Sequence, residues 1–237
     1  MKHFAIDIDG CITNGKGSFT NTQQFSKLQH YITDNNLSVF LCTGRSAPYV
    51  ESIAQLLHIN QWCICENGAY LYQPMSDKII YNPLMTDKTL EALSECKALL
   101  KTHKYTNICK VELGKEVCIS LNPIQGTTEE LYTLLQEQID TSLLYINYSS
   151  TAVDITPRGI DKGSALKLLC KKEGYHLKDI VAIGDTSGDL PFMEISGIKA
   201  CPHNARKAVK DICDYVSPIC STEGVLDVLK LQCDYPS

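Results

Sequence analysis

The chain has 237 residues, of which 44% are hydrophobic and 21% are charged, which is typical of a folded protein with one large domain or two smaller ones. The formal net charge of −5 argues against broad binding to nucleic acids or to anionic membranes. The sequence contains neither a signal-peptide pattern nor an apolar run long enough to cross a membrane, so we expect a cytoplasmic protein.

The first predicted element is a short buried strand at 4–6, which is followed directly by Asp7 and Asp9. An extended backbone points these two carboxylates to one side, where they repel unless a cation lies between them or one keeps its proton. A lone Asp-x-Asp pair is more often a simple polar turn. A calcium-binding EF-hand loop does not fit, because Ile12 and Ser18 stand where that loop needs Gly and Glu.

Strands and helices alternate over the next segment, which predicts a parallel sheet covered by helices. The elements expected here are a polar loop at 13–21, a helix that ends near 35–36, a strand at 37–42, a helix with its apolar face at 50–57 and a strand at 62–65. The two strands end in polar turns, Thr43-Gly44-Arg45 and Glu66-Asn67-Gly68. Ligands of open α/β sheets bind at the carboxyl ends of strands, so both turns are candidate site segments.

The rhythm changes in the middle of the chain, where each of two helices is followed by a pair of strands. This order predicts a small α+β module with an antiparallel sheet, bracketed by Pro83 and Pro157. We therefore predict a discontinuous core domain of residues 1–82 and 157–237, with an inserted domain at 83–156. The expected strands of the module are 108–113, 116–121, 143–148 and 152–155.

The α/β pattern then resumes, and the whole chain is predicted to have an α/β fold with a doubly wound, Rossmann-like parallel sheet core and an inserted α+β cap domain. A helix opens at Asp161-Lys162-Gly163. The remaining expected elements are a strand at 180–183 that ends in Gly184-Asp185-Thr186-Ser187-Gly188-Asp189, a strand at 198–201, an edge strand at 215–216 and a closing helix around 225–229.

The 12 cysteines raise the question of disulfides or a zinc site. They are scattered along the chain without a Cys-x-x-Cys pair, and most lie inside apolar runs. Free cysteine commonly fills such core positions. We therefore expect reduced thiols that are mostly buried.

The polar residues at the strand ends together supply what phosphoryl transfer requires. Asp7 can attack phosphorus and carry the group as an acyl phosphate, while Asp9 can protonate the leaving oxygen and later deprotonate the attacking water. Lys162 and the Thr43 hydroxyl can hold the phosphate oxygens. A Mg²⁺ ion would neutralise the repulsion between carboxylate and phosphate, and the expected ligands are Asp7, Asp185 and Asp189.

Four motifs in this order resemble those of the haloacid dehalogenase superfamily of phosphatases, and the match runs from the first strand to the last helix. The motifs are Asp7-Ile8-Asp9-Gly10, Thr43-Gly44-Arg45, Lys162 and Gly184-Asp185-Thr186-Ser187-Gly188-Asp189. The resemblance implies that Asp7 is the nucleophile and that Asp9 is the acid/base, with its backbone carbonyl offered to Mg²⁺. An Asp at position 9 points away from the dehalogenase branch, which lacks that acid.

The inserted module resembles the larger α+β cap that sucrose-phosphate phosphatases, Cof-type sugar phosphatases and phosphomannomutases share. Within this set the sequence is most similar to archaeal-type phosphoglycolate phosphatases, through Glu66-Asn67-Gly68 and Lys199-Ala200-Cys201-Pro202-His203-Asn204-Ala205. Two residues depart from the family pattern: Cys11 replaces the usual Thr, and Gly188 replaces the usual Asn. Gly188 therefore lacks a side chain that could steady a metal-bound water or Asp189.

Several other polar residues have two interpretations. Arg45 and Asn67 either contact substrate or hydrogen-bond within their loops, and Asn204 is either a helix cap or a ligand contact. Thr43 can also be a helix cap. We group Thr43, Gly44, Arg45, Asn67, Lys162 and Asn204 as candidate phosphate- or substrate-binding residues.

The sequence therefore predicts a Mg²⁺-dependent phosphatase that acts on a small phosphate ester, either phosphoglycolate or a sugar phosphate. A phosphomutase of the same fold and a non-catalytic binding protein are the alternatives. We expect a monomer or homodimer whose partner is a small molecule, with neither nucleic acid nor a membrane as a partner.

Overall fold

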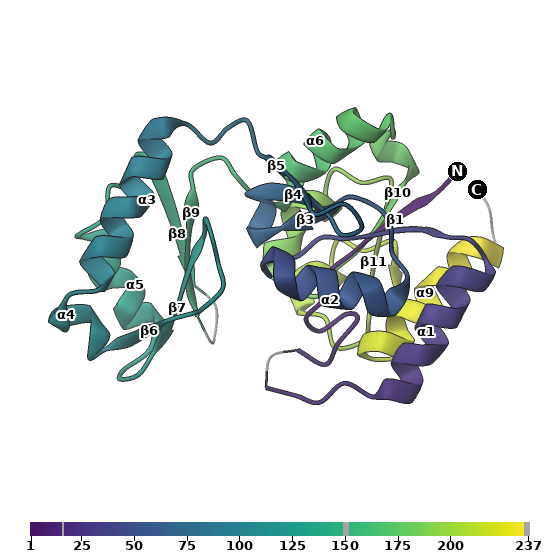
Figure 1. Cartoon of the computed structure of the whole chain (residues 1–237). Coiled ribbons are helices and arrows are strands. Elements are labelled where there is room, and N and C mark those ends of the chain that lie inside the picture. Colours follow the sequence, from purple (N-terminus) through teal and green to yellow (C-terminus); the bar gives the residue numbers. More distant parts are fainter. Residues whose placement is uncertain (16, 149–151, 235–237) are drawn as a thin grey trace.

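The computed structural model describes residues 1–15, 17–148 and 152–234. Residue 16 of the predicted polar loop, residues 149–151 of the predicted inserted domain and residues 235–237 of the predicted core lie outside this part of the chain. Figure 1 shows two lobes, a larger one that holds both termini and a smaller one built from the middle of the sequence.

The larger lobe is built on a five-stranded sheet in the order β12-β11-β10-β1-β2, and every neighbouring pair is parallel. Its strands are β1 (His3–Ile6), β2 (Ser38–Leu41), β10 (Ile180–Ile183), β11 (Ile198–Cys201) and β12 (Tyr215–Val216). The chain first adds β2 on one side of β1 and later adds β10 on the other. The strand order therefore reverses at β1, which is where open α/β sheets bind ligands.

Alternate residues of the strands face two separate apolar clusters, so both faces of the sheet are buried. Ile6 packs with one cluster, and its neighbour Ala5 packs with the other. The helices of the larger lobe that contribute to the first cluster are α1 (Thr22–Asp34), α2 (Ala47–Leu57) and α9 (Ser221–Asp234). Those that supply the second are α6 (Lys162–Glu173), α7 (Leu190–Met193) and α8 (Lys207–Lys210). This arrangement confirms the predicted doubly wound core.

A small antiparallel sheet extends the β2 edge of the core. Its strands are β3 (Cys63–Cys65), β4 (Tyr70–Gln73) and β5 (Lys78–Tyr81), in that order. A single parallel bridge between Cys42 and Ile64 connects this sheet to the core. The expected strand at 62–65 therefore exists, but it pairs mainly with an antiparallel hairpin that the sequence analysis did not predict.

The smaller lobe, which we call the inserted lobe, contains a four-stranded antiparallel sheet in the order β6-β7-β9-β8. Its strands are β6 (Cys109–Val111), β7 (Ile119–Pro123), β8 (Leu144–Tyr148) and β9 (Val153–Pro157). Its helices are α3 (Asp87–Leu100), α4 (His103–Thr106) and α5 (Thr128–Gln136). The predicted order of helices and strand pairs is confirmed. The exact boundaries of the inserted domain, 83–156, stay a prediction.

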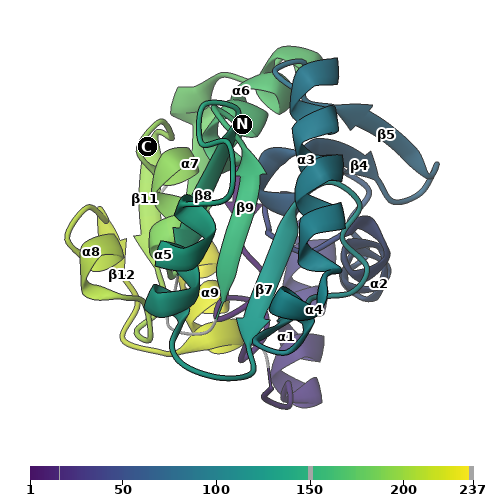
Figure 2. The same ribbon diagram turned by 90° about the vertical axis from the view of Figure 1, so that its left-hand side faces the viewer.

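The helices of the inserted lobe lie on the outer side of its sheet. Figure 2 looks onto that side, with α3 and α5 in front of β7 and β9. In Figure 1 the sheet lies between these helices and the larger lobe. The uncovered face of the sheet is therefore turned toward the core.

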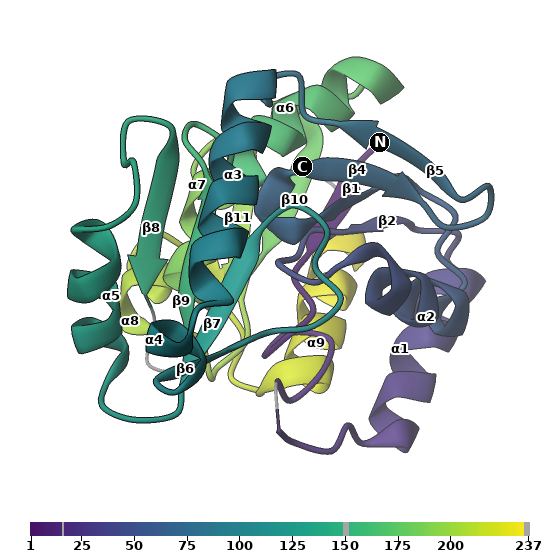
Figure 3. The same cartoon turned by 60° about the vertical axis from the view of Figure 1, so that its left-hand side comes forward.

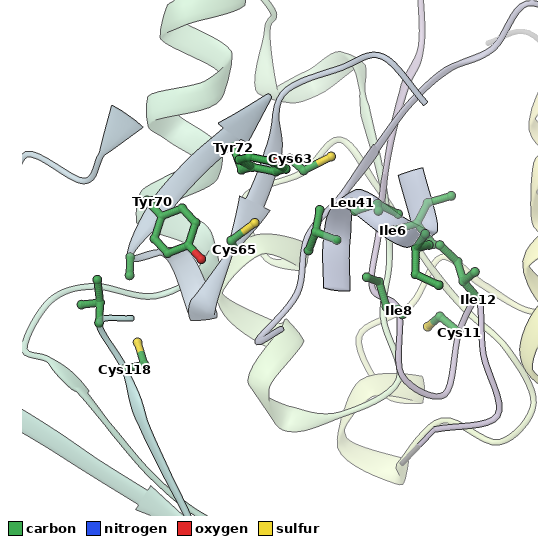
Figure 4. Close-up of a cluster of buried hydrophobic side chains, with 14 of the residues drawn as sticks. Ile6, Ile8, Cys11, Ile12, Leu41, Cys63, Cys65, Tyr70, Tyr72 and Cys118 are labelled. Carbon is green, nitrogen blue, oxygen red and sulfur yellow. The ribbon is translucent and has the colours of Figure 1, made fainter. Parts of the chain in front are cut away.

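One continuous cluster of buried side chains runs from the core into the inserted lobe. Figure 4 shows Ile6 and Cys11 at one end of the view and Cys118, from the inserted lobe, on the Tyr70 side. All twelve cysteines are free thiols. Cys220 is exposed, Cys213 and Cys233 are half-buried and the others are buried, which confirms the expected state of most of them. Among the described residues, none of the helices has the length and apolar character needed to cross a membrane.

Candidate active site

Asp7 lies at the carboxyl end of the central strand β1, and its side chain is buried against Lys162. The Lys162 ammonium donates a hydrogen bond to Asp7 Oδ1 at 2.8 Å. Burial raises the pKa of Asp7 to about 7, although the charge of Lys162 opposes this shift. Burial alone would lower the pKa of Lys162, but the charges of Asp189 and Asp7 outweigh it and raise this pKa, so the ammonium stays charged.

Lys162 is the first residue of α6, which is an unusual place for a cation because the helix dipole is positive there. Its neighbour Asp161 caps the helix by accepting a hydrogen bond from Ser164 N at 2.7 Å. The Lys162 side chain leaves the helix end and forms its ion pairs inside the core. The structure thus brings Lys162 to Asp7, as the predicted site requires.

Asp7, Asp185 and Cys11 form a group whose potential ligand atoms all lie within 4.8 Å of one another. Asp185 follows β10 and is buried beside Asp7. Burial and the charges of Asp7 and Asp189 raise the pKa of Asp185 to about 8. The close approach of the Asp185 side chain to the turn also explains why residue 10 is glycine (φ +90°), because a Cβ there would lie 2.2 Å from Asp185 Oδ2.

This group has the chemistry of a divalent cation site. Asp7 and Asp189 share the ammonium of Lys162, and Asp185 lies beside them without an ion pair among the described residues, so the fully ionised cluster carries an excess of two negative charges. Carboxylate oxygens are the ligands that Mg²⁺ prefers. Burial and the neighbouring carboxylates raise the pKa of the Cys11 thiol, which favours its protonated form. The oxygens of Asp7 and Asp185 are therefore the side-chain ligands that fit such an ion.

Asp189, which the sequence analysis predicts as a further metal ligand, has other partners. It is fully buried, and its Oδ1 accepts a hydrogen bond from Lys162 at 2.5 Å. Its Oδ2 accepts from the backbone N of Asp185 at 3.0 Å and of Thr186 at 2.9 Å, and from the Thr186 hydroxyl at 3.2 Å. These contacts show that Asp189 holds Lys162 and the turn after β10, whereas its expected role as a metal ligand stays a prediction.

Asp9, two residues beyond Asp7, is held by Arg45 from the turn after β2. The guanidinium donates from Nε to Asp9 Oδ2 at 2.6 Å and from Nη2 to Asp9 Oδ1 at 2.8 Å, which is a bidentate ion pair. Arg45 Nη1 also contacts Glu112 of the inserted lobe at 3.4 Å. The ring of Tyr49 lies 4.7 Å from the guanidinium carbon. Arg45 therefore connects Asp9, the candidate acid/base in the core, with Glu112 in the inserted lobe.

The turn after β2 meets the turn after β3, as the sequence predicts for neighbouring strand ends. The Thr43 side chain is buried, and the Thr43 carbonyl accepts a hydrogen bond from Asn67 N at 3.1 Å. A Cβ at Gly44 would lie 2.7 Å from Asn67 Oδ1, so a residue without a side chain suits this position. These contacts place Thr43, Gly44 and Asn67 together at the carboxyl edge of the core strands, whereas their roles in binding phosphate stay predictions.

Asn204 connects two loops. Its Nδ2 donates to the Gly10 carbonyl at 2.8 Å, and its Oδ1 accepts from Ser221 N, the first residue of α9, at 2.7 Å. Both ends of the amide are thus engaged with backbone groups. Of the two interpretations of Asn204, this geometry favours the helix cap, which also steadies the turn that follows Asp9.

A cavity of about 390 Å³ lies between the core and the inserted lobe. The core contributes Lys162, Asn67 and Ser187, and Gly188 lies on the same wall. The residues of the inserted lobe that line the cavity are Tyr145, Asn147, Asp154 and Thr156, and Arg158 lines it directly after β9.

The lining residues of the inserted lobe were missed by the sequence analysis, although the sequence carries a signal for them. In β8, Tyr145 and Asn147 alternate with the buried Leu144 and Ile146. In β9, Asp154 and Thr156 alternate in the same way with Val153 and Ile155. Side chains at every second position of a strand share a face, so this alternation predicts one polar face of the sheet.

A family model described as haloacid dehalogenase-like hydrolase matches the chain over residues 4–113 and 100–229. These two segments span both lobes. A phosphoglycolate phosphatase of Methanothermobacter thermautotrophicus is 24% identical over 234 residues, which cover 97% of this chain and 98% of the relative. A phosphoglycolate phosphatase of Thermoplasma volcanium is 27% identical over 230 residues, which cover 96% of each chain.

Two solved structures share the fold. A protein of Thermoplasma acidophilum superposes with a TM-score of 0.77 at 24% identity, over 98% of this chain and 97% of the other. A haloacid dehalogenase-like hydrolase of Bacteroides thetaiotaomicron gives a TM-score of 0.77 at 18% identity, over 97% of this chain and 98% of the other. At these identities the likeness concerns the fold alone, and it confirms the predicted fold class.

Proposed function

This chain belongs to the haloacid dehalogenase-like hydrolase family, and on that premise we propose that it is a Mg²⁺-dependent phosphatase that hydrolyses a small phosphate ester through an aspartyl-phosphate on Asp7. The observation that carries the proposal is the buried group of Asp7, Lys162 and Asp185 at the carboxyl edge of the central strands. A carboxylate, an ammonium and a cation-binding carboxylate are what transfer of a phosphoryl group to an aspartate requires.

In the first step, an Asp7 oxygen attacks phosphorus, and the bond between phosphorus and the ester oxygen breaks. The leaving alcohol takes a proton from Asp9. In the second step, Asp9 removes a proton from a water molecule as that water attacks phosphorus. The bond between phosphorus and the Asp7 oxygen then breaks, so the carboxylate is regenerated and inorganic phosphate leaves. Lys162 holds one Asp7 oxygen throughout and offsets negative charge beside the phosphoryl group.

The ion pair between Asp9 and Arg45 places a condition on this mechanism. Both Asp9 oxygens accept hydrogen bonds from the guanidinium, which therefore competes with the leaving alcohol for the same carboxyl group. Asp9 must therefore separate from at least one guanidinium nitrogen when substrate binds. An incoming anionic phosphate is a suitable competitor for Arg45, because guanidinium groups also bind phosphate in a bidentate manner.

The metal ion would be held by the side chains of Asp7 and Asp185, with the Asp9 carbonyl as the further ligand that the family resemblance implies. When bound, Mg²⁺ supplies positive charge that offsets the repulsion between the carboxylates and the phosphate. The raised pKa of Asp185, about 8, supports this assignment, because it indicates that nearby positive charge does not balance the negative charge of this buried carboxylate.

The substrate we propose has a small polar leaving group. Curated relatives that align over nearly the whole chain are phosphoglycolate phosphatases, which supports phosphoglycolate. The cavity next to Lys162 has a volume of about 390 Å³ and is lined by hydroxyl, amide and charged side chains. A sugar phosphate also suits this lining, and it is the alternative substrate.

The test is phosphate release from a panel that includes phosphoglycolate, several sugar phosphates and p-nitrophenyl phosphate, measured with Mg²⁺ and with EDTA. We expect release that requires the metal and favours the small esters. If sugar phosphates are isomerised without release of inorganic phosphate, the protein is a mutase and the proposal is wrong. If no ester is turned over at any metal concentration, the catalytic assignment fails.

A further inference from the structure

Glu66, the residue directly after β3, has a fully buried carboxylate that lies outside the group of charges around Asp7. Its hydrogen-bond donors are the backbone N–H groups of Glu116 at 2.7 Å, Val117 at 2.8 Å and Cys118 at 2.8 Å, and the hydroxyl of Tyr70 at 3.2 Å. Hydrogen bonds to an ionised acceptor are stronger than those between neutral groups. Four of them explain how this carboxylate can be buried without a basic partner among its hydrogen-bonded neighbours.

The three backbone donors belong to a different lobe from Glu66 itself. They come from the end of the segment 112–118, which connects β6 and β7 of the inserted lobe and which we call the β6–β7 loop. Figure 3 shows this loop leaving the inserted sheet and extending toward the core on the side of α2. The Cys118 thiol also contacts the Glu66 carbonyl at 3.0 Å, and the Tyr81 hydroxyl donates to Glu116 Oε1 at 2.7 Å.

The backbone at Glu66 is held in an uncommon conformation. Glu66 has φ +44° and Asn67 has φ +56°, so two successive non-glycine residues occupy the left-handed region. Asn tolerates this region, whereas Glu visits it rarely and at a cost in free energy. Residues in such conformations persist where surrounding contacts fix them, and they concentrate at functional sites. The four hydrogen bonds to the carboxylate are contacts of that kind.

The β6–β7 loop carries two side chains that reach the candidate site. Glu112 contacts Arg45, the partner of Asp9, at 3.4 Å. The Lys115 side chain is only 9% exposed and lies 3.5 Å from Asp154, which lines the cavity. The loop that Glu66 holds therefore contacts Arg45, which pairs with Asp9, and Asp154 in the wall of the cavity.

We propose that Glu66 is a positioning residue that fastens the inserted lobe to the core through the β6–β7 loop, and that this contact fixes the cavity at a size suited to small phosphate esters. The effect on substrates rests on the proposed phosphatase function, whereas the fastening itself does not. Two chain connections join the lobes, and Glu66 supplies a further attachment beside the site. The cavity wall formed by β8 and β9 then stays at one distance from Lys162, so leaving-group contacts are formed before the substrate arrives.

The decisive variant is Glu66→Gln, which keeps the size of the side chain. Its neutral carboxamide retains one acceptor oxygen but turns an NH₂ group toward N–H donors, so hydrogen bonds to the loop are lost. Glu116→Gln is the matched control, because it makes the same chemical change on the loop while its backbone N–H still reaches Glu66. Glu116 is exposed, and its side chain can still accept from Tyr81 as an amide.

Hydrogen exchange gives the first readout. In the wild-type protein we expect the amides of residues 116–118 to exchange as slowly as those of β7, and Glu66→Gln should speed them at least about tenfold. The control should leave them within about twofold. Fast exchange of these amides in the wild-type protein would overturn the proposal, and this measurement does not depend on the folding of any variant or on catalytic activity.

Kinetics gives the second readout. For the best small ester, we expect Glu66→Gln to raise KM about tenfold or more while kcat changes less than about threefold, because leaving-group contacts loosen and the residues around Asp7 stay in place. For p-nitrophenyl phosphate, kcat/KM should change less than about threefold, so selectivity for the small ester falls. Unchanged KM and selectivity in a variant with accelerated exchange would refute the link to substrate size. Absence of phosphate release from the wild-type protein would instead refute the proposed function and leave the exchange test standing.

Discussion

We expect Asp185 to lower the stability of the metal-free protein, although the same carboxylate is a proposed metal ligand. Its pKa is raised from 3.8 to about 8 by burial and by the charges of Asp7 and Asp189. A group whose pKa is raised on folding binds its proton more tightly in the native state, so the protein loses stability as pH rises through this window. The loss begins near the unfolded pKa and is complete above the folded one. Asp185→Asn removes this loss without changing the size of the side chain.

The magnitude follows from the size of the shift. A difference of about four pKa units corresponds to roughly 5 kcal/mol at a pH above both values. Part of this penalty is shared with Asp7, whose own pKa is raised to about 7. We therefore expect metal-free Asp185→Asn to be more stable than the wild-type protein by at least about 2 kcal/mol near pH 9, and by clearly less near pH 5.5.

The assay is urea unfolding followed by circular dichroism in EDTA at several pH values. Added Mg²⁺ should shift the difference by about 2.7 kcal/mol in favour of the wild-type protein at a hundred times its Kd, since the ion stabilises the wild-type protein and should do little for the variant. Asp211→Asn is a suitable control, because Asp211 pairs with Lys207 on the surface, where such pairs contribute at most about 1 kcal/mol. If metal-free Asp185→Asn is no more stable than the wild-type protein near pH 9, the buried, uncompensated carboxylate inferred here is wrong.

Three further predictions concern the same cluster. Asp7→Asn should lower phosphate release by at least about 10³-fold while circular dichroism stays unchanged, because it removes the nucleophile and little volume; retained turnover would exclude the aspartyl-phosphate. Lys162→Met should lower the free energy of unfolding by about 3–5 kcal/mol at pH 8, because Asp7 and Asp189 lose their buried partner, and a change below about 1 kcal/mol would contradict the ion pairs. Dialysis against EDTA should abolish phosphate release and added Mg²⁺ should restore it; full activity in EDTA would remove the metal from the mechanism.

The core of the fold was predictable because each strand and the turn that follows it are indicated by residues that are neighbours in the sequence. Short apolar runs end in polar turns at β1, β2 and β10, and the carboxyl ends of parallel strands meet at one edge. Asp7 and Asp185 could therefore be placed together although 178 residues separate them along the chain (185 − 7). The hairpin of β4 and β5 was not predicted, because β5 is mostly exposed and shows little apolar periodicity.

Contacts between side chains from different loops could not be predicted from the sequence. The ion pair of Asp9 with Arg45 depends on the paths of two turns, and that of Arg45 with Glu112 depends on how the lobes are placed. The same is true of Glu66, because three of its four donors are backbone groups that any residue except proline would supply. No pattern of residue types records such an interaction, although an acidic residue in a buried turn is a reason to look for one.

The four aspartates of the site look alike in the sequence, but their partners divide them into two groups. Asp9 and Asp189 are fully paired, whereas Asp7 and Asp185 are not. Asp9 is paired with Arg45, and the oxygens of Asp189 are taken by Lys162 and by the turn after β10. Asp7 shares Lys162 with Asp189, and Asp185 forms no ion pair with any lysine or arginine in the part of the chain that the structure describes. Negative charge without an ionic partner remains between Asp7 and Asp185, which is where we propose that the cation binds. We therefore expect the partners of each carboxylate, more than its place in a motif, to decide which of the proposed roles it has: metal binding, holding a loop or proton transfer.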